Sequence, residues 1–146
     1  MGVGNLYRCD DAIGILIARN LKNKNCGNMI VREQSGEGTS LMEAWQHFNR
    51  VILVDAVSSG ASPGTLHCLD ASTDSIPSRF FSCSSHNFSV AEAIELARTL
   101  NQLPQSLKLY GIEGKNFQHG ETVTPELEAM IEPVTNQIIQ FVSSPH

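Results

Sequence analysis

The chain has 146 residues, 41% of them hydrophobic and 17% charged, which suits one domain with a sizeable core. Fifteen acidic residues against ten basic residues give a net charge of −5. Proteins that bind nucleic acid or anionic membranes need a basic face, so this balance argues against both functions. No apolar stretch approaches the roughly 18–20 residues of a membrane span. Met1 is followed by Gly-Val-Gly-Asn without the features of a signal peptide, so we expect a cytoplasmic protein.

Residues 10–24 predict the first helix. Their apolar residues recur at spacings of three and four, as they do on one face of a helix. Asp10 and Asp11 lie at the start of this segment, where carboxylates complement the helix dipole. A helix-capping role is therefore the simplest interpretation of these two acids.

Strands and helices alternate along most of the remaining chain. Four branched apolar residues at 51–54 predict a strand buried on both faces, which is typical of a parallel sheet covered by helices. The alternation predicts an α/β fold over 1–146, a single domain with three α/β/α layers and a mostly parallel, twisted sheet flanked by helices on both faces. The expected elements are strands at 29–31, 50–57, 65–69 and 107–112, and helices at 40–48, 89–100 and 125–141.

Sequence signals mark several helix ends. Capping-box patterns begin at Ser40 and Ser89. Thr124 precedes Pro125, as an N-cap precedes proline at the first helical position. We expect Pro133 to kink the last helix.

Three side chains that could carry chemistry should meet at one edge of the sheet. In open α/β sheets, ligands bind beyond the carboxyl ends of the strands. Asp11 follows the opening loop, Asp55 ends the most buried strand, and His86 precedes the helix at 89–100. Two carboxylates and an imidazole can bind a first-row divalent metal or act as general acid and base. The alternative is structural: a capping acid, a strand-end hydrogen-bonding residue and a surface histidine.

Other candidate groups carry weaker signals. Gly2-x-Gly4 lacks the third glycine of a dinucleotide fingerprint, so it favours a turn that requires small residues. Ser84 and Ser85 adjoin His86, but no G-x-S-x-G elbow is present. The remaining histidines have no acidic partner at ligand spacing, and we expect surface or strand positions for His47, His67, His119 and His146.

The motifs together resemble those of a known family. Gly2-Val-Gly-Asn5-x4-Asp10-Asp11-x-x-Gly14 is similar to the opening G-x-G-N-x4-D-D/E-x-x-G of the hydrogenase maturation proteases. These endopeptidases trim the C-terminus of the large subunit of nickel–iron hydrogenases. Further matching segments follow in the same order: Val54-Asp55-Ala56, Pro63-Gly64-Thr65, Ser85-His86, Thr124-Pro125 and Ala129-Met-Ile-Glu-Pro133.

The resemblance implies a role for each of the three side chains. Asp11, Asp55 and His86 correspond to the metal ligands of the family and form its catalytic site. The implied metal is nickel, which the hydrogenase large-subunit precursor supplies and which serves as the recognition element. The implied enzyme is a monomeric, aspartyl-type hydrolase without an organic cofactor. Either the metal polarises the scissile carbonyl or an aspartate activates water.

The chain departs from the family pattern in two places. Family members carry a hydrophobic first strand before G-x-G-N, whereas here Met1 lies directly before this loop. We therefore expect the first central strand to be missing or truncated, with a gap between the strands near 29–32 and 51–54. The family loop D-G-G-T-x-G is only loosely matched by residues 34–39, which weakens the expectation of substrate contacts there.

Two other functions are compatible with this fold. The first is a non-catalytic, flavodoxin-like module that binds a small anion on residues 2–5. Asp10 and Asp11 argue against it, because they would repel a phosphate. The second is a related metal-dependent peptidase with another substrate.

Overall fold

The protein folds around one five-stranded sheet, and the computed structural model describes residues 1–24, 27, 29–35, 37–77 and 90–143. The strand order is β2-β1-β3-β5-β4, and all neighbours are parallel except β4 and β5. In the described residues, no helix is long and apolar enough to cross a membrane. The strands are β1 (Gly2–Val3), β2 (Glu33–Gln34), β3 (Arg50–Val57), β4 (Leu66–Asp70) and β5 (Ser106–Glu113). The helices are η1 (Cys9–Ala12), α1 (Ile13–Lys24), α2 (Gly38–Trp45), α3 (Val90–Thr99), α4 (Pro125–Glu128) and α5 (Ile131–Ser143).

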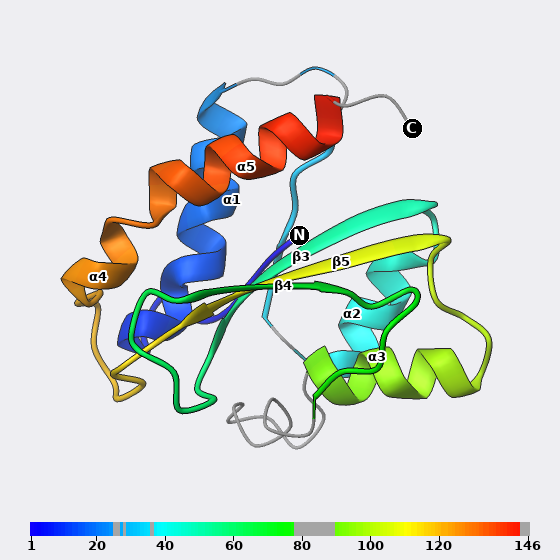
Figure 1. Cartoon of the computed structure of the whole chain (residues 1–146), viewed down its shortest axis with the longest axis horizontal. Coiled ribbons are helices and arrows are strands. Elements are labelled where there is room, and N and C mark those ends of the chain that lie inside the picture. The colour runs from blue at the N-terminus through cyan, green and yellow to red at the C-terminus, as the bar shows by residue number, and fades with distance from the viewer. Residues whose placement is uncertain (25–26, 28, 36, 78–89, 144–146) are drawn as a thin grey trace.

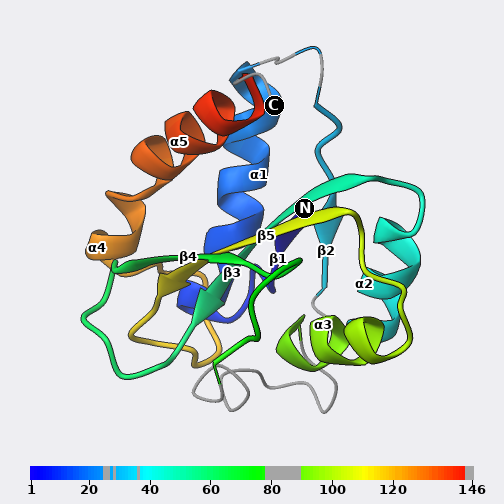
Figure 2. The same ribbon diagram turned by 45° about the vertical axis from the view of Figure 1, so that its right-hand side comes forward.

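Helices cover both faces of the sheet, which confirms the three-layer prediction. Figures 1 and 2 show α1 and α5 on one side of the strands and α2 and α3 on the other. Alternation along β3 divides the core: Leu53 packs toward α2 and α3, whereas Val54 packs toward α1 and α5. Trp45 and Ile94 are fully buried in the first core, and Ile17 is fully buried in the second.

The two longest strands agree with the sequence prediction. β3 spans the predicted 50–57 and pairs with β5 along its whole length, from Arg50↔Ser106 to Val57↔Glu113. Burial on both faces explains why a continuous apolar run was a sufficient signal. β4 is partly buried, as predicted, and it runs antiparallel to β5 at the edge of the sheet.

Two element boundaries were predicted wrongly. A strand was expected at 29–31, but β2 lies at Glu33–Gln34, because the short β1 offers a partner only to these residues. The helix predicted from Ser40 begins at Gly38. The reason is that the Glu37 carboxylate accepts hydrogen bonds from the backbone N–H groups of Thr39 and Ser40, both at 3.0 Å, and caps the helix earlier.

The C-terminal helix is interrupted rather than kinked at Pro133. α4 ends at Glu128 and α5 begins at Ile131, so the break precedes the proline. Pro133 lies in the first turn of α5, where a residue needs no backbone N–H for helical hydrogen bonding. The proline therefore fits the start of a new helix and does not distort an existing one.

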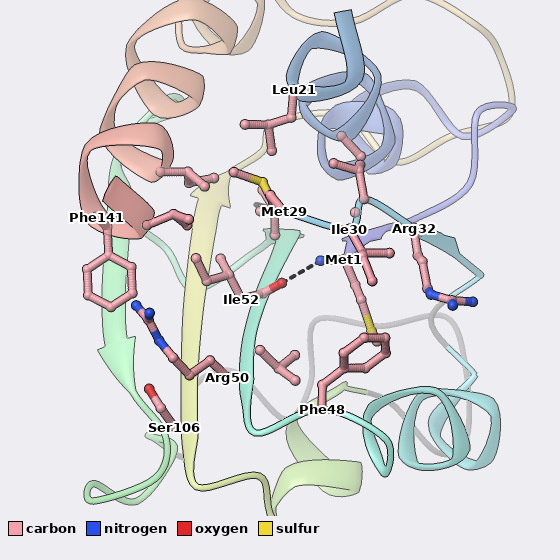
Figure 3. Close-up of a pocket in the computed structure, with 17 residues that line it drawn as sticks. Met1, Leu21, Met29, Ile30, Arg32, Phe48, Arg50, Ile52, Ser106 and Phe141 are labelled. Carbon is pink, nitrogen blue, oxygen red and sulfur yellow. Dashed lines mark hydrogen bonds between the residues drawn. The ribbon is translucent and has the colours of Figure 1, made fainter. Parts of the chain in front are cut away.

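The central strand β1 is short and spans only Gly2–Val3. Gly2 pairs with Val54 of β3 on one side and with Glu33 of β2 on the other. Toward its N-terminus, β3 extends four residues beyond Val54, to Arg50. A cavity of 260 Å³ lies beyond the N-terminal end of β1. Figure 3 shows Met1 at this cavity, with its amine donating a hydrogen bond to the carbonyl oxygen of Ile52. The lining is mainly apolar and includes Leu21, Ile30 and Phe141.

An apolar extension of about six residues before Met1 is expected to raise the melting temperature. Burial lowers the pKa of the Met1 amine to about 5, so its charged form is disfavoured where it lies. The extension replaces this amine with a peptide group and fills apolar space between two strands. Thermal unfolding followed by circular dichroism measures the gain. A Gly/Ser extension of equal length is the control, and equal melting temperatures for the two would contradict the prediction.

Candidate active site

Asp11 and Asp55 meet at the carboxyl edge of the sheet. Asp11 lies in η1, directly after the loop that follows β1, and Asp55 lies two residues before the end of β3. Burial raises the pKa of Asp55 well above its usual value, and the negative charge of Asp11 raises it further. The backbone N–H of Ala56 donates to Asp55 Oδ1 at 2.9 Å and offsets only part of this effect. The site therefore holds two carboxyl groups that repel each other when both are ionised.

Close backbone packing places η1 against the strands. A Cβ atom on Gly14 would lie 2.2 Å from the carbonyl oxygen of Val54 and 2.4 Å from that of Val3. A Cβ atom on Gly4, whose φ is +153°, would lie 1.9 Å from the carbonyl oxygen of Asp11. The glycines of the opening motif thus serve helix–strand contact, in agreement with the prediction of a turn that requires small residues.

Asp10 anchors the segment that carries Asp11. It is fully buried, and its carboxylate accepts hydrogen bonds from the backbone N–H groups of Lys115 at 2.8 Å, Asn116 at 2.9 Å and Thr124 at 2.7 Å. The Thr124 hydroxyl donates at 2.6 Å. Burial opposes the ionisation of Asp10, but these bonds together outweigh it and lower its pKa. Asp10 lies in the first turn of η1, as predicted, but its carboxylate binds a distant loop and not the N–H groups of its own helix.

The third predicted ligand, His86, lies outside the described residues, as do Ser84 and Ser85. The structure therefore brings together Asp11 and Asp55 and leaves the place of His86 as a prediction. Within the described part of the chain, no group of three His, Cys, Asp or Glu side chains could hold one metal ion. A metal at this edge would need a ligand from residues 78–89 or from a partner molecule.

A buried carboxylate–histidine pair near Asp55 was missed in the sequence. His67 lies in β4, which agrees with the expected strand position, and its Nε2 lies 3.1 Å from Glu113 Oε1, a partner 46 residues away that sequence spacing did not indicate. Gly111 is paired with Asp55 on one side and with His67 on the other, which puts both side chains on the same face of the sheet. The alternation of polar residues at the ends of two strands was the available signal, but it required the antiparallel register of β4 and β5.

Replacing Asp55 by Asn is expected to raise the melting temperature at pH 7 by a few degrees. The amide removes a desolvated charge that Asp11 repels. Because the pKa of Asp55 is higher in the folded chain than in the unfolded chain, the wild-type stability falls as the pH rises from about 4 through the raised pKa. Thermal unfolding from pH 4 to 8 should show this decrease in the wild type and a weaker one in the variant.

The exposed Asp74, at the opposite edge of the sheet, supplies the matched control. Asp74→Asn should follow the wild-type pH dependence. If Asp55→Asn did the same, the two carboxyl groups would not repel each other in the folded protein.

Replacing Asp10 by Asn is expected to lower the free energy of unfolding by about 2–4 kcal/mol, because buried N–H donors lose a charged acceptor. Urea unfolding followed by far-UV circular dichroism measures the loss. Asp70→Asn is the control, since the Asp70 carboxylate accepts bonds from Ser72 in its own turn. Equal losses in the two variants would show that Asp10 is no special anchor.

Comparison with known proteins gives consistent matches. A family model described as hydrogenase maturation protease matches residues 15–141. The hydrogenase 2 maturation protease of Escherichia coli is 29% identical over 143 residues, which cover 95% of this chain and 86% of that protein.

Solved structures agree with these matches. The hydrogenase maturating endopeptidase HybD of Escherichia coli has a TM-score of 0.66 at 25% identity, covering 97% of this chain and 88% of that chain. The NiFe hydrogenase maturation protease HycI of Thermococcus kodakarensis has a TM-score of 0.74 at 20% identity, covering 98% of this chain and 90% of that chain. This second likeness concerns the fold. The family indicated by the opening motif is thus the one found by independent comparisons.

Proposed function

We infer that this chain, which belongs to the hydrogenase maturation protease family and is therefore a peptidase, cleaves the large-subunit precursor of a nickel–iron hydrogenase. The cleavage releases a short C-terminal peptide. The precursor is recognised when it carries nickel, and the reaction takes place in the cytoplasm with the protease as a monomer. The metal arrives with the substrate and is not a resident cofactor of the protease.

The observation that carries this proposal is the pair of acids at the carboxyl edge. Asp11 raises the pKa of the desolvated Asp55, so the site is electrostatically strained when no cation is present. A divalent ion brought by the precursor relieves this repulsion and converts it into attraction. Carboxylate oxygens and an imidazole nitrogen are suitable ligands for nickel, and His86 supplies the imidazole. A precursor without nickel gains none of this energy.

Peptide hydrolysis adds water across the scissile bond. The water oxygen attacks the carbonyl carbon, the C–N bond breaks, and the leaving amine takes up a proton. Asp11 and Asp55 lie where they can hold the metal-bearing segment and orient this water. An aspartyl-type mechanism assigns the removal of the water proton to one of these carboxylates.

Incubation with nickel-loaded and nickel-free precursor tests the proposal. The loaded precursor should lose a C-terminal peptide, measured as a mass decrease, and the nickel-free precursor should stay intact. Removing nickel from the precursor with a chelator should stop cleavage, whereas stripping the purified protease should not. Equal cleavage of both precursors would refute recognition through nickel.

Single substitutions test two of the three site residues. Asp11→Asn and His86→Ala should each lower the cleavage rate by at least about 100-fold. Neither should lower the melting temperature, since Asp11→Asn removes one of two repelling charges and neither change is expected to create a cavity in the core. The matched controls are Asp74→Asn and His47→Ala, both exposed in the structure. A variant at Asp11 or His86 that cleaved at the wild-type rate would remove that residue from the site.

A further inference from the structure

The carboxylate of Glu113 joins both ends of the loop at 58–65. Glu113 is 1% exposed and lies at the end of β5. Its Oε2 accepts from the backbone N–H of Ser59 at 2.7 Å, and its Oε1 accepts from the Ser59 hydroxyl at 2.6 Å. The same Oε1 lies 3.1 Å from His67 Nε2 on β4. One buried side chain thus contacts the first residues of the loop and the strand that follows it.

Backbone hydrogen bonds reinforce this arrangement. The N–H of Gly64 donates to the carbonyl oxygen of Glu113 at 2.8 Å. The N–H of Glu113 donates to the carbonyl oxygen of Thr65, also at 2.8 Å. Gly64 has a φ of +88°, a conformation that suits the tight return of the chain. The loop is consequently fixed at its start and at its end by the same residue.

The loop begins three residues after Asp55 and extends beyond the carboxyl end of β3 (Figure 1). Ser58, Gly60 and Ser62 are exposed along it. A substrate segment whose metal is held by Asp55 has to pass beside this loop, because both lie at the same edge of the sheet. The loop thus offers exposed backbone and hydroxyl groups to an extended peptide.

We propose that Glu113 is a positioning residue of the peptidase: its buried carboxylate holds the loop at 58–65 beside Asp55 as one wall of the precursor-binding site. The role rests on the proposed function. Glu113 acts through Ser59 and His67 and does not touch the reacting atoms. Loss of its carboxylate removes the contacts with Ser59 and His67. The precursor then has to order the loop itself, which weakens binding.

Cleavage kinetics of a matched series test this role. Glu113→Leu should raise KM for the nickel-loaded precursor about ten- to a hundredfold, with kcat changed less than about threefold. Glu113→Gln retains one acceptor oxygen and should restore most of the wild-type KM. Ser59→Ala removes only the hydroxyl bond and should give a smaller increase in KM. Glu95→Leu is the control, since Glu95 holds the backbone of Ile76 elsewhere in the fold.

Hydrogen exchange of the Ser59 and Gly64 amides supplies a measurement that does not depend on activity. It should accelerate in Glu113→Leu and stay slow in Glu95→Leu. If Glu113→Leu does not fold, Ser59→Ala decides: a raised KM supports the role, and an unchanged KM overturns it. A wild-type chain that neither binds nor cleaves loaded precursor overturns the proposed function and this role together. A wild type that cleaves, with unchanged KM in Glu113→Leu, overturns only the role of Glu113.

Discussion

The backbone at the start of α1 packs directly against the two strands beneath it. This contact exists because Gly14 has no side chain, so the carbonyl oxygens of Val3 and Val54 approach the helix directly. The approach fixes η1 at the end of β1 and determines where its two consecutive acids point. Asp10 is turned into the protein to bind a loop, and Asp11 remains near Asp55. One constraint on backbone distance therefore places both the anchor Asp10 and the acidic pair Asp11 and Asp55.

The electrostatics of the site oppose the stability of the fold. A desolvated carboxyl next to another acid lowers the stability of the protein at neutral pH. Such a local penalty is typical of sites that act on a charged ligand. In the proposed reaction the ligand is a cation held by another protein, so the repulsion discriminates between loaded and unloaded precursor. The electrostatic repulsion that destabilises the free protein is relieved in the complex and so favours its formation.

The sequence was sufficient where local pattern and burial agree. The apolar run in β3 predicted a central strand, and the positions of Asp11 and Asp55 relative to the strands predicted their meeting, since strand ends in a parallel sheet share an edge. It was insufficient where a distant partner decides. Asp10 looked like a helix cap, but its donors lie 105 to 114 positions away in the chain.

Of two further errors, one has a local cause and the other a distant one. The start of α2 depends on which nearby side chain accepts hydrogen bonds from the first N–H groups of the helix. The carboxylate of Glu37 accepts them, so the helix begins before the capping-box pattern at Ser40. The pairing of His67 with Glu113 depends on the register of an antiparallel edge strand, which has no signature within β4 itself. A period in the sequence reports which face of an element is buried, but not which residue of another element lies opposite.

The hydrogen bonds between Asp10 and Thr124 also bear on when the acidic segment can fold during translation. Thr124 is synthesised 114 residues after Asp10. A nascent chain therefore exposes the Asp10 carboxylate on the ribosome long before the Thr124 donor is available. The strand β1 likewise waits for β3, and β3 for β5, before the sheet can close around it. Such long-range closure delays assembly of the acidic pair until the later strands have been synthesised. The nascent chain must therefore close its sheet before the acidic pair can act on another protein.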